Sequence, residues 1–268
     1  MPYIKPFRGV RPRRDIVHRV AAPPYDVLSS DEARDMAKDN PYSFLHVGKP
    51  EIDLPPGTDH DSDAVYAKGK ENYERFLQEG VIAPDPQECF YIYKQVWGDH
   101  VQTGLVAAAS CRDYLDDLIK KHELTRPDKE NDRMRHIETL NAQTGPVFLT
   151  YRASEAIDAI VAGVLKGTPE YDFATDDGVR HIFHVVETGP DLSGKEKSAA
   201  DPRRTDRVQL VSVEKHLGLQ GTPARFFSKA VCADAVKDPG CGPFRNAISF
   251  QEVAGQHDAA LGVADGAV

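Results

Sequence analysis

The chain has 268 residues, of which 40% are hydrophobic and 28% are charged, and its formal net charge is −9. These values are typical of a globular protein with a sizeable core. The acidic balance disfavours general nucleic-acid binding, which normally needs a surplus of lysine and arginine. No apolar run reaches the length of a membrane span, and the N-terminal residues lack the apolar segment of a signal peptide.

The cysteines show neither the C-x-x-C spacing of a zinc site nor a cluster with histidines. They are Cys89, Cys111, Cys232 and Cys241. Buried thiols in a reducing compartment are the default for such a pattern. We therefore expect a cytoplasmic protein that does not associate with membranes and holds no structural metal. The sequence predicts no particular oligomeric state.

The first predicted elements lie within the first eighty residues. A short helix is predicted over 31–38, with Ser29 or Ser30 as its N-cap. Residues 44–47 are predicted to form a short strand. Apolar residues at helical spacing predict a longer helix over 63–78.

The clearest strand signals are two runs, 89–97 and 101–111, joined by a turn at 98–100. The later predicted elements are, in order, helix 112–124, helix 127–141, strand 146–151, helix 154–166 and strand 179–187. This mixture with a hairpin indicates an α+β fold rather than a doubly wound sheet.

The composition of the chain changes near residue 187. Beyond this point Ala, Gly and isolated Pro are frequent, and acidic and basic residues balance, so the first 190 residues carry the whole net charge of −9. We therefore predict a folded domain over 1–186 and an atypical tail over 187–268. The tail is either disordered or a segment from a different context.

The most distinctive segment is 120–136, with the sequence KKHELTRPDKENDRMRH. Pro127 predicts the start of a helix. Three of its side chains share one face at i, i+4 and i+7: Lys129, Arg133 and His136. Arg126 precedes the helix, at the end where backbone N–H groups favour an anion. The segment therefore predicts a site for a phosphate or carboxylate.

A solvated, salt-bridged helix explains the same segment, and this alternative stays open. Its basis is the set of interleaved acidic residues: Asp128, Glu130 and Asp132. A second segment, APPYDV at 22–27, leaves two interpretations as well. Its prolines hold an extended backbone from which Tyr25 and Asp26 could point into a cleft, or the segment is a structural turn.

Several standard motifs are absent. There is no GxxxxGK[ST] loop, no GxGxxG after a strand and no GxSxG elbow. Residues 59–63 begin like a calcium loop, but Ala64 and Lys70 stand where Gly and Glu are needed. A basic cluster near the start is either a solvated arm or a nucleic-acid contact. Its members are Arg8, Arg11, Arg13 and Arg14.

Five segments together resemble one family. They are PFRGVRP at 6–12, APPYDV at 22–27, NPYSFLHV at 40–47, KKHELTRPDKENDRMRH at 120–136 and TGPVFLTY at 144–151. In this order they are similar to the domain-of-unknown-function family numbered 1015, often described as ParB-like, over about residues 2–186.

The resemblance implies a ParB-like α+β fold, a mixed sheet with packed helices as in sulfiredoxin and free-serine kinases. In those relatives a nucleotide phosphate and a small substrate meet in one cleft. Similar members are often encoded beside enzymes of phosphorylated serine biosynthesis. The implied activity is phosphotransfer to a small hydroxyl substrate related to serine or phosphoserine, with ATP or ADP and Mg²⁺ as cofactors.

Two sets of residues take roles under this interpretation. The substrate-binding set, which neutralises phosphate charge or contacts the substrate, is Arg126, Lys129, Arg133, His136 and Tyr25. The catalytic candidates, as general bases or proton donors, are Glu123, Asp26 and His122.

The chain also departs from the family pattern. Full members carry a later Asp-Gly-His-His-Arg signature, which this sequence lacks. A truncated or frame-shifted gene product explains this, with loss of activity, and so does divergence. Two further functions are compatible with the resemblance: a non-catalytic regulator that binds a phosphorylated metabolite, and a ParB-like DNA-binding protein. The net charge of −9 and the lack of a helix-turn-helix pattern disfavour DNA.

Overall fold

The computed structural model describes residues 2–120, 126–151, 154–187, 208–215 and 245–247. Up to residue 120 the elements are β1 (Ile4–Lys5), β2 (Gly9–Pro12), the 3-10 helix η1 (Arg14–Ile16), α1 (Val17–Val20), α2 (Ser30–Ala37), α3 (Leu45–Gly48), the 3-10 helix η2 (Pro50–Asp53), α4 (Asp63–Gln78), β3 (Ile82–Pro84), β4 (Cys89–Trp97), β5 (His100–Ser110) and α5 (Cys111–Leu115). They continue as α6 (Pro127–Leu140), β6 (Ala142–Gln143), β7 (Val147–Tyr151), α7 (Glu155–Val164), β8 (Tyr171–Ala174), β9 (Arg180–Glu187), β10 (Val208–Lys215) and β11 (Arg245–Ala247). The predicted α+β class is confirmed. Within these ranges no helix is long and apolar enough to cross a membrane.

The larger sheet has seven strands in the order β7-β10-β5-β4-β9-β8, with β1 also paired to β5. Its centre includes the predicted hairpin of β4 and β5, in which Trp97 pairs with His100 and Gly98 has a φ of 56°. β10 runs antiparallel to β5 and parallel to β7. The strand between β5 and β7 therefore comes from the stretch that we predicted to be a tail.

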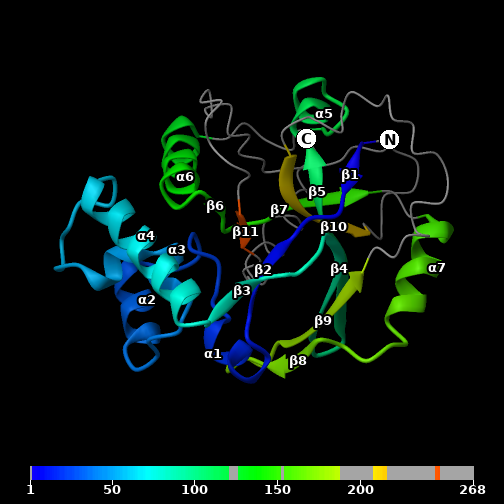
Figure 1. Cartoon of the computed structure of the whole chain (residues 1–268), viewed down its shortest axis with the longest axis horizontal. Coiled ribbons are helices and arrows are strands. Elements are labelled where there is room, and N and C mark those ends of the chain that lie inside the picture. The colour runs from blue at the N-terminus through cyan, green and yellow to red at the C-terminus, as the bar shows by residue number, and fades with distance from the viewer. Residues whose placement is uncertain (1, 121–125, 152–153, 188–207, 216–244, 248–268) are drawn as a thin grey trace, which may run out of the picture.

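The smaller sheet has the order β3-β2-β11-β6. Figure 1 shows its strands in the middle of the molecule, with α2, α3, α4 and α6 on one side and the larger sheet on the other. One apolar cluster joins the helices to the smaller sheet and includes Val10, Val47, Tyr73, Phe76 and Leu140. A second cluster lies on the larger sheet and includes Phe7, Tyr91, Val106, Tyr171 and Phe183. The two clusters fix the helices and the larger sheet on either side of β2.

The strand predicted over 44–47 was wrong, because Leu45–Gly48 forms the helical turn α3 with Phe44 at its N-cap. Helical hydrogen bonding starts with the turn before it. The amide of Ser43 donates to the carbonyl of Asn40 at 3.0 Å, and the amide of His46 donates to the carbonyl of Ser43 at 3.2 Å. Most of the segment is buried, and a buried run this short has the same apolar signature in a strand and in a helix.

The helix predicted over 112–124 is shorter in the structure, where α5 ends at Leu115. Asp117 has a φ of 59°, a left-handed conformation that ends a helix. The carbonyl of Asp113 then accepts hydrogen bonds from the amides of Leu118 and Ile119, at 2.8 and 2.9 Å. Residues 121–124 of the prediction lie outside the described residues.

Ser29 caps α2 with a capping box. Its hydroxyl accepts the amide of Glu32 at 3.3 Å, and the Glu32 carboxylate accepts the amide of Ser29 at 2.8 Å. We expect Ser29→Ala to lower the free energy of unfolding by about 1 kcal/mol in a urea titration. Ser62→Ala is the matched control, because Ser62 holds the N-cap position of α4 without a side-chain cap bond. Equal losses in the two variants would contradict the capping role.

Candidate anion-binding site

α6 is the helix that the segment 120–136 predicted. Pro127 occupies its first turn, after Arg126 in an extended conformation, and Asn141 ends it with a φ of 49°. Asp128 and Glu130 lie in this first turn, so negative charge already stands near the backbone N–H groups at this end of α6. An anion at the start of α6 therefore depends on side-chain cations more than on backbone amides.

Arg126 and Lys129 are both exposed near the start of α6. The guanidinium of Arg126 binds Asp128 through two hydrogen bonds, Nε to Oδ1 at 3.1 Å and Nη2 to Oδ2 at 2.7 Å. This hydrogen bonding lowers the pKa of Asp128. Because both groups of this pair face solvent, their attraction is weak and a phosphate can compete with the carboxylate for Arg126.

Arg133 lies one helical turn further along and is mostly buried. Its Nε and Nη2 donate to Oδ2 of Asp132 at 3.0 and 2.9 Å. Its guanidinium lies over the ring of Tyr25, 3.8 Å from the ring centroid. The structure thus brings together Arg133 and Tyr25, from the two segments that the sequence singled out. Burial raises the pKa of Tyr25, and the neighbouring cation opposes this only in part.

Asp132 and Tyr66 join the cluster formed by Arg133 and Tyr25, and they were not predicted as site residues. The hydroxyl of Tyr66 donates to Oδ1 of Asp132 at 2.8 Å. Burial and this hydrogen bond raise the pKa of Tyr66. Arg135 lies 4.3 Å from the centroid of the Tyr66 ring. Helical spacing predicted α4, on which Tyr66 is buried, but that spacing gave no sign that the Tyr66 hydroxyl meets α6.

His136 shares the face of Arg133 but is 2% exposed. Its Nε2 lies 2.9 Å from the carbonyl of Val47, so this nitrogen carries the proton and Nδ1 does not. Burial, with a contribution from Arg133, lowers the pKa of His136 to about 4. At neutral pH the ring therefore adds no positive charge. We assign it to holding α3 against α6, in place of the substrate contact that we predicted.

The three catalytic candidates differ in what the structure describes. Asp26 is exposed and follows Tyr25 directly in the loop before α2. His122 and Glu123 lie outside the described residues. Asp26 is therefore the one candidate base whose position, next to Tyr25 in this loop, the structure describes.

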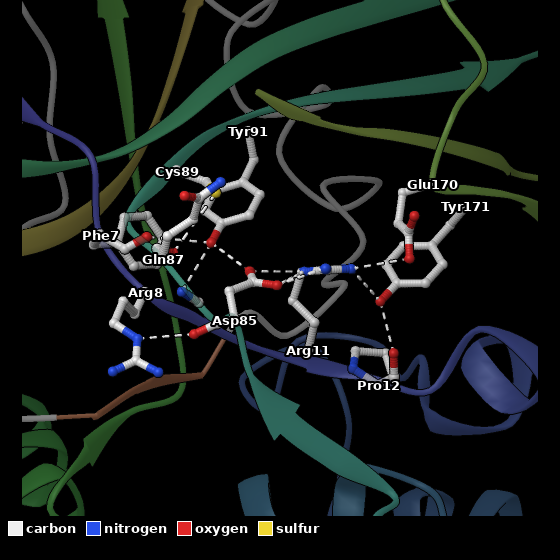
Figure 2. A network of polar contacts seen from close by, with 11 residues as sticks. Phe7, Arg8, Arg11, Pro12, Asp85, Gln87, Cys89, Tyr91, Glu170 and Tyr171 are labelled. Atoms are coloured by element: carbon white, nitrogen blue, oxygen red, sulfur yellow. Dashed lines mark hydrogen bonds and ion pairs between the residues drawn. The ribbon is translucent and has the colours of Figure 1, made fainter. Parts of the chain in front are cut away.

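A second polar cluster is buried at the junction of the two sheets (Figure 2). Arg11 of β2 donates to the carboxylate of Asp85 through Nε, at 2.9 Å to Oδ2, and through Nη2, at 2.6 Å to Oδ1. Oδ2 of Asp85 also accepts the hydroxyl of Tyr91 in β4 at 2.6 Å. Nη1 of Arg11 donates to the hydroxyl of Tyr171 in β8 at 2.6 Å and lies 3.4 Å from Glu170.

The polar atoms of this network face one another, which indicates a structural role. The side chains of Arg11 and Asp85 are 14% and 6% exposed. Although burial acts in the opposite direction, the bonds to Asp85 raise the pKa of Arg11, and burial raises the pKa of Tyr171 to about 12. The network also uses an arginine of the predicted basic cluster, since Arg11 points inward.

The described residues contain no group of three or more His, Cys, Asp or Glu side chains arranged to hold a metal ion. The sequence led us to expect Mg²⁺ only as the companion of a bound nucleotide. Such an ion is commonly held by one or two carboxylates together with phosphate oxygens and water. Exposed Asp26 offers one such carboxylate.

The fold and the two polar clusters define an α+β protein with a charged surface on α6. A family model described as Protein of unknown function (DUF1015) matches residues 4–203. The chain belongs to this family, and the resemblance inferred from its five segments is confirmed at that level. No curated protein and no solved structure matches the chain.

Proposed function

We propose that this protein binds a small phosphorylated molecule at the surface of α6 and transfers phosphate to or from a hydroxyl group. The observation that carries the proposal is the stacking of Arg133 on Tyr25 at 3.8 Å, on the helix whose first residues include the exposed Lys129 and follow the exposed Arg126. The ParB-like resemblance, through free-serine kinases, supports serine or phosphoserine as the substrate and ATP or ADP with Mg²⁺ as the phosphate donor.

In this proposal one group of residues binds the phosphate and another transfers the proton. Arg126, Lys129 and Arg133 neutralise the phosphate, with the planar guanidinium groups suited to two-point contacts. Asp26 accepts the proton of the attacking hydroxyl, and Glu123 and His122 are further candidates for proton transfer. When Mg²⁺ and a nucleotide are bound, the ion balances charge on the phosphate oxygens. Cys89, a buried free thiol, is consistent with a location in the cytoplasm.

A regulator without turnover shares this surface with the enzyme and differs only in chemistry. Phosphate transfer from labelled ATP or ADP to serine separates the two, since a regulator binds phosphoserine and transfers nothing.

The DNA-binding alternative has less support. Of its basic cluster, Arg11 is buried with Asp85 and Arg13 is bound to Asp15. A DNA titration at low salt should therefore show no binding.

Ligand binding is tested by thermal melting of the full chain with phosphoserine, serine, ADP, and ATP plus Mg²⁺. A ligand at one hundred times its Kd should stabilise the folded state by roughly 2.7 kcal/mol and raise the midpoint. We expect phosphoserine or a nucleotide to do so, and Arg126→Ala and Arg133→Ala to abolish the shift without unfolding the chain.

Arg13→Ala is the matched control for Arg126→Ala. Arg13 binds Asp15 two residues away through Nε and Nη2, at 2.8 and 3.0 Å, the same pattern as Arg126 with Asp128. It lies outside the proposed site, so its variant should keep the ligand shift. Unchanged ligand shifts in both site variants, or no shift in the wild-type chain, would overturn the proposed function.

A further inference from the structure

A second charged pair lies on the segment between α3 and α4, directly after Gly48, which approaches Tyr25. Nζ of Lys49 is 3.1 Å from Oε1 of Glu51, and their side chains are 12% and 9% exposed. Oε1 of Glu51 also accepts the hydroxyl of Ser30 at 2.8 Å. Burial acts to raise the pKa of Glu51, but hydrogen bonds and Lys49 hold it below its usual value, so the carboxylate is charged. Lys49 is therefore held in place by a fixed anion.

The chain leading to Lys49 passes along the face of α6 that carries Arg133. The carbonyl of Val47 accepts the bond from His136. At Gly48, a Cβ atom would stand 4.0 Å from Cβ of Tyr25, whose ring lies under Arg133. Lys49 comes next. The segment that positions its ammonium group thus contacts both α6 and Tyr25.

The loop that carries Asp26 is fixed at both ends by these charged groups. Its first end is Tyr25, on which Arg133 stacks. Its second end is Ser30, which donates to Glu51. Asp26, the exposed candidate base, therefore belongs to a loop held between the Arg133–Asp132 pair and the Lys49–Glu51 pair.

Stability alone is a weak reason to bury a lysine with a glutamate. The cost of removing both charges from water offsets much of their attraction, and an apolar pair of similar volume often serves as well. A lysine ammonium keeps two further N–H donors after it binds one carboxylate, because it carries three in all. Those donors suit a second anionic group on a ligand.

We propose that Lys49, positioned by Glu51, is a second cation of the site and binds the carboxylate of a ligand whose phosphate is bound by Arg126, Lys129 and Arg133. This inference rests on the proposed function and narrows its ligand class to small phosphorylated acids. Arginines suit the phosphate because they offer planar two-point contacts, whereas lysine offers a compact point charge to a carboxylate. Glu51 is a positioning residue.

The test compares two probes that differ by one carboxylate, phosphoserine and phosphoethanolamine, by calorimetric titration of the full chain. Lys49→Met should weaken phosphoserine about ten-fold or more, as expected for a lost hydrogen bond between charged groups, and leave phosphoethanolamine within about two-fold. Arg133→Ala should weaken both probes. Lys68→Met is the matched control, because Lys68 pairs with Glu71 on α4 at 2.6 Å, and it should weaken neither.

Two further variants separate a contact from a structural effect. Lys49→Arg keeps the charge and should keep the preference for phosphoserine. Glu51→Gln keeps an acceptor for Ser30 but releases Lys49, so it should lose that preference, and it provides the test if Lys49→Met does not fold. Equal effects of Lys49→Met on both probes, or no effect on either while Arg133→Ala weakens both, would overturn this inference and leave the proposed function standing. Binding of neither probe to the wild-type chain would overturn both.

Discussion

Replacing Asp85 with alanine is expected to lower the free energy of unfolding by about 3–5 kcal/mol. The change leaves the guanidinium of Arg11, 14% exposed, without its main counter-ion. It also removes the acceptor of the Tyr91 hydroxyl, which lies 2.6 Å from Oδ2. A buried charge and a buried donor both lose their partners, and each such loss is costly when water cannot replace it.

Urea titration of wild type and variant measures this loss, with Asp172→Ala as the control. Asp172 forms the same kind of two-point pair with Arg180, at 2.7 Å for both contacts, but Arg180 is exposed. Water can solvate Arg180 after the change, so the control should lose far less stability. Similar losses in the two variants would show that the network in Figure 2 contributes no more than a surface pair.

Acidification from pH 7 to pH 5 is expected to destabilise the fold by about 2 kcal/mol for each of two buried histidines. Burial lowers the pKa of His136 and of His181 to about 4. Because the folded pKa lies below the unfolded value of about 6.5, the unfolded chain binds the extra protons first. The stability that the two neutral histidines contribute is fully present above about pH 6.5 and is lost as the pH falls toward 4.

The hydrogen bonds of both rings fit the neutral form. Nδ1 of His181 lies 2.6 Å from the hydroxyl of Tyr93, and its Nε2 lies 3.0 Å from Oγ1 of Thr175. Thr175 already donates its hydroxyl proton to Asp177, so it accepts from Nε2, and Nδ1 is left to accept from Tyr93. Protonation of Nδ1 would remove this acceptor, and the Tyr93 hydroxyl would have to turn its proton away from the ring.

Urea midpoints at pH 7 and pH 5 test the histidine prediction. His136→Gln is the informative variant, because an amide can still donate to Val47 but does not titrate. It should lose stability less steeply than wild type over this range. Carboxylates with a lowered pKa, such as Asp53, lose their contribution only below about pH 4, outside the window. The same slope in wild type and variant would exclude a lowered pKa for His136 in the folded chain.

Local signals predicted the elements better than the contacts between them. Pro127 placed the start of α6, and helical spacing placed α4 with its observed bounds of Asp63–Gln78. The pairing of β10 between β5 and β7 had no such signal, because neither neighbour is close to it in the chain. The prediction of a strand over 44–47 failed for a related reason. The burial of α3 depends on its packing against α4 and α6 more than on the order of apolar residues within it.

The same limit applies to the site. The spacing of α6 and the Tyr–Asp pair of APPYDV indicated Arg133 and Tyr25 separately, and only the fold stacks one on the other. Arg11 had the appearance of part of a basic arm because its partner, Asp85, is 74 residues away. A local sequence pattern cannot show that Arg11 is paired with an aspartate so far away in the chain.

The position of β10 has a consequence for synthesis on the ribosome. The hairpin of β4 and β5 is local and can form early, whereas β5 and β7 must wait for residues 208–215 to emerge before the strand between them is present. Until then both strands keep an open edge that another nascent chain can join. Growing chains of this protein are therefore most exposed to aggregation in the interval between the appearance of β7 and that of β10.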